Sequence, residues 1–74
     1  MYDKYVREPD AREMKAFVKV ENAVENEWDE FFNLVCEEDD ANLLNNRITN
    51  PVLLAFIERC GLTVEEVCTW YFMY

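Results

Sequence analysis

The stretch that decides the fold is residues 51–74, PVLLAFIERCGLTVEEVCTWYFMY, which predicts two helices joined by a tight turn. Its first ten residues are apolar on almost every side, which is typical of a buried helix, so we expect 51–60 to form the central helix of the fold. Pro51 suits the first helical position, and Thr49 or Asn50 can cap it. Gly61 supplies the left-handed residue that ends such a helix.

The second half of this stretch predicts a C-terminal helix over 64–73. Thr63-Val-Glu-Glu66 has the form of a capping box, in which the Thr and Glu side chains each bond to the backbone of the other. Consecutive bulky residues follow, and they cannot all point toward one small core. We therefore expect part of this aromatic end to contact a partner or a second copy of the chain. The candidate residues are Trp70, Phe72, Met73 and Tyr74.

The region before residue 51 predicts further helices. No Gly or Pro occurs from Asp10 to Glu37, and apolar residues alternate at three and four in a seam broken only by Glu21. Residues 9–37 are thus expected to form one long helix starting at Pro9, with a kink near Asn22, or two helices. The seam residues are Met14, Phe17, Val24, Trp28, Phe31 and Val35.

The ends of that region are predicted from charge and capping. Four consecutive acids at residues 37–40 oppose the helix dipole, so the helix should end there. Asp39 or Asp40 can cap a short helix over 41–46.

Residues 1–7 show no clear pattern and are expected to form an N-terminal arm. With 74 residues there is room for one domain only, so we predict an all-α domain over 1–74, a small bundle of three to four helices.

The charge of the chain lies in one block. Residues 21–40 carry nine carboxylates and no Lys or Arg, which equals the whole formal net charge of −9. If it were fully helical, this block would extend roughly 30 Å. Because DNA carries one charge per roughly 1.7 Å of axis, a rigid row of carboxylates could occupy a basic groove on another protein. The candidate binding residues are Glu25, Glu27, Asp29, Glu30, Glu37, Glu38, Asp39 and Asp40.

The same composition argues against other classes of function. The chain contains no His and no Ser, which removes the commonest general base and the usual nucleophile pairs, so we expect no enzyme. The run at 37–40 lacks the alternating ligands and Gly of a calcium loop, and we expect no metal or cofactor. Acidity also disfavours direct binding to nucleic acid or to a membrane surface.

The cysteines and the apolar pattern indicate the compartment. Cys36, Cys60 and Cys68 are odd in number and widely spaced, which is a poor disulfide framework. The N-terminus has no signal-peptide pattern, and no apolar run approaches membrane-spanning length. We expect a cytoplasmic protein, in the host cytoplasm if a phage encodes it.

Two functions follow from these patterns. The first is a small acidic protein that binds a basic, nucleic-acid-binding surface of a partner protein. In composition, though in no defined motif, the chain resembles phage-encoded nuclease inhibitors, anti-CRISPR proteins and DNA mimics. The alternative is a homo-oligomer, such as a homodimer, or an adaptor, in which the seam or the aromatic end is the working surface and the acids only solvate the helix.

Overall fold

A computed structural model describes residues 10–73, and these residues form five helices and no strand. The all-α class is confirmed, with five helices where three to four were expected. The helices are α1 (Ala11–Ala23), α2 (Trp28–Cys36), α3 (Asp40–Leu44), α4 (Pro51–Arg59) and α5 (Val64–Met73). The molecule measures 32 × 25 × 18 Å.

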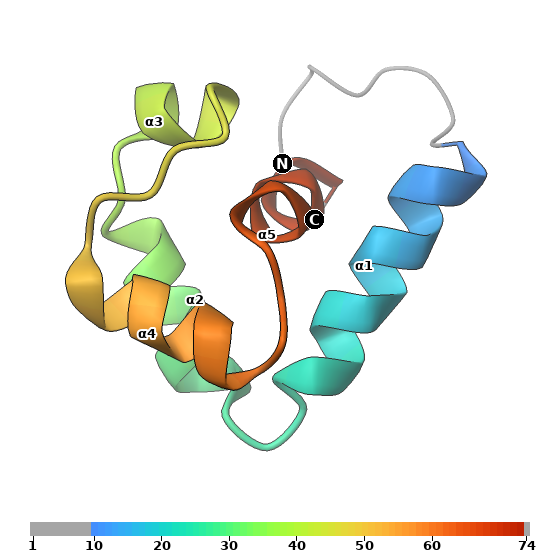
Figure 1. Cartoon of the computed structure of the whole chain (residues 1–74), viewed down its shortest axis with the longest axis horizontal. Helices are drawn as coiled ribbons and strands as arrows, with labels where there is room; N and C mark the ends of the chain where they lie inside the picture. The colour runs from blue at the N-terminus through green and yellow to red at the C-terminus, as the bar shows by residue number, and fades with distance from the viewer. Residues whose placement is uncertain (1–9, 74) are drawn as a thin grey trace.

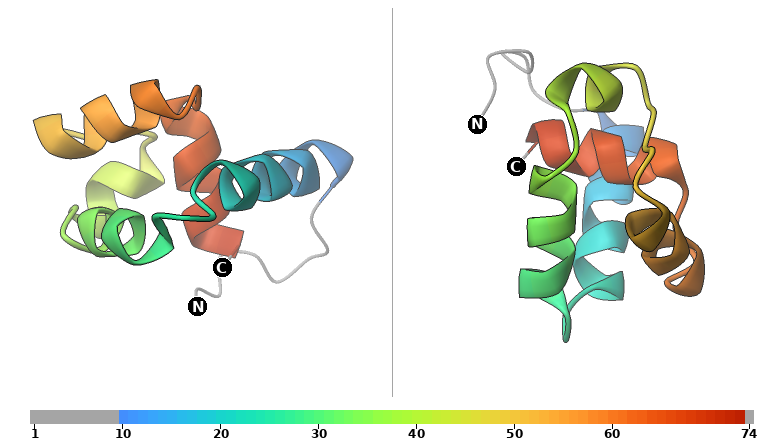
Figure 2. Two further views of the ribbon diagram at one scale, coloured as in Figure 1. Left: turned by 90° about the horizontal axis from the view of Figure 1, so that it is seen from below. Right: turned by 90° about the vertical axis from the view of Figure 1, so that its left-hand side faces the viewer.

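The centre of the fold is α5, and the expectation that 51–60 would be the central helix was wrong. Figure 1 shows α5 between α1 on one side and α2 with α4 on the other, and Figure 2 shows it crossing α1. Four side chains of α5 are buried, whereas α4 leaves Val52 and Leu54 59% and 37% exposed. Since α1 covers α5 and nothing described covers the outer side of α4, α4 is the more peripheral of the two helices.

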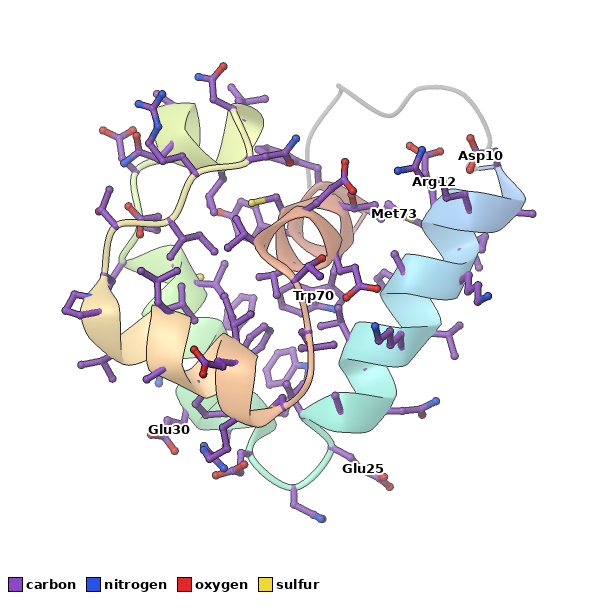
Figure 3. The ribbon with its side chains drawn as sticks, viewed as in Figure 1. Asp10, Arg12, Glu25, Glu30, Trp70 and Met73 are labelled. Carbon is purple, nitrogen blue, oxygen red and sulfur yellow. The ribbon has the colours of Figure 1, made fainter. Side chains whose placement is uncertain are left out.

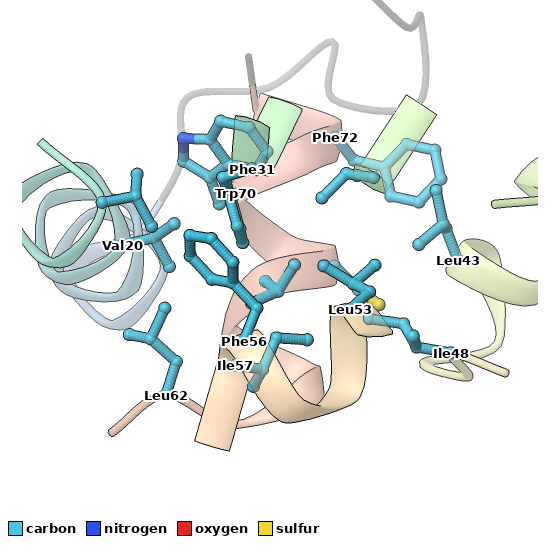
Figure 4. Packing of buried hydrophobic residues seen from close by; sticks show 14 residues of the cluster. Val20, Phe31, Leu43, Ile48, Leu53, Phe56, Ile57, Leu62, Trp70 and Phe72 are labelled. Atoms are coloured by element: carbon cyan, nitrogen blue, oxygen red, sulfur yellow. The ribbon is translucent and has the colours of Figure 1, made fainter. Parts of the chain in front are cut away.

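The core is aromatic at its middle. The Phe31 ring centroid lies 5.5 Å from that of Phe56 and 5.1 Å from that of Trp70, so α2, α4 and α5 meet there (Figure 4). Fourteen apolar side chains among residues 10–73 are buried. They are Val20, Val24, Phe31, Val35, Leu43, Ile48, Leu53, Phe56, Ile57, Leu62, Val67, Cys68, Trp70 and Phe72.

The interval 9–37 holds two helices. A capping box between Asp10 and Glu13, with bonds of 2.8 and 3.0 Å, starts α1 at Ala11, whereas the expected start at Pro9 lies outside the described residues. α1 ends at Ala23, and Asn22 lies within it rather than at a kink. The break falls at 24–27, where Val24 is fully buried and Glu27 makes no capping bond to α2.

Because of that break, the residues that α1 buries differ from those expected for one continuous helix. Met14 is 44% exposed, while Val20, which the seam did not include, is fully buried. A heptad pattern assumes one continuous helix. Because the chain turns at 24–27, α1 and α2 each bury their own face, and the N-terminal part of the pattern no longer applies.

The remaining helix ends follow their local sequence signals. Asp39 caps α3, and the Asn50 side chain accepts from Val52 N at 2.9 Å, which starts α4 at Pro51. Gly61 has φ +72°, and the Gly61 and Leu62 amides bond back to α4 at 3.0 Å each, the pattern of a Schellman cap. The expected capping box opens α5, with bonds of 3.1 and 2.9 Å between Thr63 and Glu66.

Candidate functional site

The acidic block does not form one continuous rod, because α2 separates it into two groups. We call Glu25, Glu27, Asp29 and Glu30 the α2 N-terminal carboxylates, and Glu37, Asp39 and Asp40 the α2 C-terminal carboxylates. Figure 3 shows Glu25 and Glu30 around the α1–α2 loop, at one end of the molecule. The nine residues of α2 span about 13 Å, so the 30 Å row of charge expected for an unbroken helix is not present.

Glu38 belongs to the interior, although the sequence placed it on the acidic face. Its side chain is only 8% exposed. Oε1 accepts from Thr49 N at 2.9 Å and Asn50 N at 3.3 Å, and Oε2 accepts from Asn42 Nδ2 at 3.0 Å and Thr49 Oγ1 at 3.1 Å. This carboxylate therefore ties the segment after α2 to the N-terminus of α4.

The charge of Glu38 is maintained by these bonds. Burial alone raises the pKa of the Glu38 carboxyl, but the hydrogen bonds from Asn42, Thr49 and Asn50 outweigh it, so the pKa lies below its ordinary value. Glu38 is thus ionised and buried, so a partner cannot contact its carboxylate directly.

Two more acids of the block are engaged by the fold. The Glu21 carboxylate accepts a hydrogen bond of 2.6 Å from Trp70 Nε1, which explains why an acid interrupts the apolar seam. Glu27 forms a two-pronged pair with Arg59, with N–O distances of 3.1 and 3.3 Å. Hydrogen bonding to Glu27 and its charge raise the pKa of Arg59.

Five acids of the block form no ion pair with a described base, although the charge of Glu30, in addition to the hydrogen bond to Glu27, raises the pKa of Arg59. Glu25, Asp29, Glu30, Glu37 and Asp39 are all exposed, and none lies in an ion pair with a base among residues 10–73. Asp40 is also exposed and accepts from the Tyr71 hydroxyl at 3.4 Å. A shallow depression lined by residues 25–30 lies among the α2 N-terminal carboxylates.

Two of the described bases are held by acids on α5. Arg12 Nη2 lies 3.4 Å from Glu65, and Lys19 Nζ lies 2.9 Å from Glu66. Both pairs line a groove between α1 and the start of α5. Burial raises the pKa of Glu66, and hydrogen bonds from Lys19 and Thr63 lower it further than burial raises it. These bases therefore do not offset the charge of the α2 groups.

The aromatic end is mostly core, which corrects the expectation of an exposed aromatic surface. Trp70 is 0% exposed and Phe72 is 4% exposed, because α5 is covered on several sides. Met73 is half-buried. Tyr74 and the expected arm at 1–7 lie outside the described residues. The seam proposed as an oligomer surface is also occupied, since Val24, Phe31 and Val35 are fully buried.

The sequence reasoning missed the apolar outer face of α4. Pro51, Val52, Leu54 and Ala55 are all exposed there. The signal was present, since a helix that is apolar on every side and lies at the edge of a fold must expose part of that surface.

The described residues contain no group of three or more Cys, Asp or Glu side chains arranged to hold a metal ion. Within 10–73, every helix is too short or too polar to cross a bilayer. Comparisons with protein-family models, with curated proteins and with solved structures found no match to this chain.

Proposed function

We propose that this chain is a non-enzymatic acidic binding protein that engages the basic surface of a protein partner. The observation that carries the proposal is the set of five exposed carboxylates at the two ends of α2, none of them paired with a described base. Charges left unpaired in this way attract a basic partner over about 10 Å at 0.1 M salt and speed its association.

The fold supports this proposal over a purely solvating role. Three of the described bases are paired with acids across helices, Arg12 with Glu65, Lys19 with Glu66 and Arg59 with Glu27. A face that only keeps the protein in solution usually mixes signs. Such a partner would have a nucleic-acid-binding surface, and the protein would act as an inhibitor or DNA mimic of the phage anti-CRISPR or anti-nuclease kind.

The test compares two charge reversals at equivalent helix positions. Asp29 and Glu65 are both exposed and both occupy the second residue of a helix, in α2 and α5. Wild type, Asp29→Lys combined with Glu37→Lys, and Glu65→Lys are each immobilised and exposed to cell lysate at about 0.05 and 0.5 M salt, which brackets strong and weak screening.

We expect specific proteins to be retained by wild type and by Glu65→Lys at low salt only, and to be lost from the double variant. A retained protein should also be released by competing DNA if mimicry is involved. Retention that is equal in all three proteins and at both salt concentrations would refute a charge-driven function.

A further inference from the structure

The segment that carries the α2 C-terminal carboxylates is bonded to the residues that begin α4. The Glu38 carboxylate binds the backbone of Thr49 and Asn50, and Asn50 is the cap of α4. Glu37 and Asp39 flank Glu38 in the chain, and both are exposed. The acidic segment and the first turn of α4 are therefore held together as one surface.

That face of α4 is apolar at its N-terminal half. Val52 is 59% exposed and Leu54 is 37% exposed, and the exposed Pro51 and Ala55 lie between them around the helix. Val52 is the most exposed of the large apolar side chains in the described residues. The polar residues of the helix, Glu58 and Arg59, follow only at its C-terminal end.

A second exposed apolar strip lacks this acidic surrounding. Met14 and Val18 on α1 are 44% and 49% exposed, and the neighbouring exposed charges are those of Asp10, Arg12, Lys15 and Lys19. The bases on α1 outnumber Asp10 near that strip, whereas the segment next to the start of α4 carries Glu37 and Asp39.

Glu37 also has no evident role in the fold. It is the C-terminal cap residue of α2, where the helix dipole is negative and an acid is unfavourable. By contrast, Asp29 and Glu30 in the first turn of α2 complement the dipole. Fold stability therefore does not explain the acid at position 37.

We infer that the outer face of α4, with Glu37 and Asp39 beside it, is the docking surface for a basic amphipathic helix of a partner protein. Such a helix presents an apolar stripe to Val52 and Leu54 and its flanking Lys or Arg side chains to the two carboxylates. This inference rests on the proposed function and specifies where on the acidic surface the partner binds.

The probe is a synthetic Leu/Lys peptide of about four helical turns with all Leu on one face, compared with a peptide of the same composition in scrambled order. Binding is measured by fluorescence anisotropy. The variant Val52→Gln with Leu54→Gln tests the apolar face without changing charge, and Gln is compatible with a helix. Val18→Gln is the matched control on α1.

We expect the amphipathic peptide to bind more tightly than the scrambled one and the α4 double variant to weaken it about tenfold, or about 1.4 kcal/mol. Val18→Gln should leave binding unchanged. Glu37→Lys with Asp39→Gln should weaken binding more than Glu25→Lys with Asp29→Lys. Circular dichroism and denaturant midpoints confirm that each variant is folded.

The outcomes separate the inference from the proposed function. Equal binding of both peptides, with charge reversal weakening both, would refute the α4 docking surface and leave the acidic function standing. Binding that no charge reversal alters would refute both. If sedimentation shows a concentration-dependent dimer that Val52→Gln abolishes, the occupant is a second copy of this chain and the inference is overturned.

Discussion

Replacing Glu38 by Ala removes four hydrogen bonds, three that join the end of α2 to the start of α4 and one that joins it to Asn42 of α3. Two are short bonds of 2.9 and 3.0 Å, from Thr49 N and Asn42 Nδ2, and two are longer, at 3.1 and 3.3 Å. A hydrogen bond to a charged group contributes about 1.5–3 kcal/mol. Thr49 is exposed and Asn42 is half-buried, so in the variant water can hydrogen-bond to the donors that lose Glu38. We therefore expect the free energy of unfolding to fall by about 2–3 kcal/mol in total.

This loss is large for so small a domain. At about 0.05–0.15 kcal/mol per residue, the free energy of unfolding is on the order of 4–11 kcal/mol. The assay is urea unfolding followed by tryptophan fluorescence, since Trp70 lies in the core. Glu37→Ala is the matched control, because its side chain is exposed and lies next in the chain, and it should change the free energy by less than about 0.5 kcal/mol. A Glu38→Ala loss no larger than that of the control would refute the assigned role.

The pH dependence gives a second test of the same carboxylate. The folded pKa of Glu38 lies below the ordinary value of 4.5, so its charge stabilises the fold above that value and ceases to do so as pH falls through the folded pKa. The difference in unfolding free energy between wild type and Glu38→Gln should therefore be largest near neutral pH and shrink below about pH 4. A difference that is constant with pH would show that the charge is not what stabilises the structure.

Three further predictions concern the core and the turns. Glu21→Ala leaves the buried indole N–H of Trp70 without its acceptor, so the free energy of unfolding in urea should fall by about 1–3 kcal/mol. Glu21→Gln should recover most of this loss. Equal stability of wild type and Glu21→Ala would contradict the prediction. Gly61→Ala should cost about 1 kcal/mol, because φ is +72° although no atom lies within 4 Å of an added Cβ, and Gly61→Asn should cost less; an Ala variant as stable as wild type would count against the left-handed cap. Exposed Cys36 should react with a thiol reagent in the native state, and Cys68, 1% exposed, only on unfolding; equal rates for the two would contradict their placement.

Helix ends whose signals are local could be predicted from the sequence. The caps at Asn50 and Thr63 and the Gly61 terminus act within three residues of their own helix, so the residue types determine the geometry. The helices over 51–59 and 64–73 accordingly lie within one residue of their expected bounds.

Features that depend on contacts far apart in the chain could not be predicted. The sequence around Glu38 does not distinguish it from the acids at 37, 39 and 40. It accepts hydrogen bonds only because the fold brings Thr49 and Asn50 next to it. The burial of Trp70 likewise requires α1 and α2 on opposite sides of α5, which the helical pattern of one segment does not contain. The break at 24–27 has no Gly or Pro and arises where α1 and α2 both bury side chains against α5.

The acidic block also shows the difference between local sequence signals and contacts made by the fold, and this difference reduces the number of its acids that are free to bind a partner. A count of nine carboxylates treats them as equivalent, yet the fold uses Glu21, Glu27 and Glu38 as hydrogen-bond or ion-pair partners and Asp39 as the cap of α3. Glu37 stands at the negative end of α2 without a side-chain hydrogen bond or ion pair among the described residues to explain it, and an acid there costs about 0.3–1 kcal/mol relative to a base. A surface shaped only for stability and solubility would favour Lys there, because the flanking acids would remain and the dipole would be complemented. An acid kept at that position, beside the apolar face of α4, is better explained by a basic partner than by solvation.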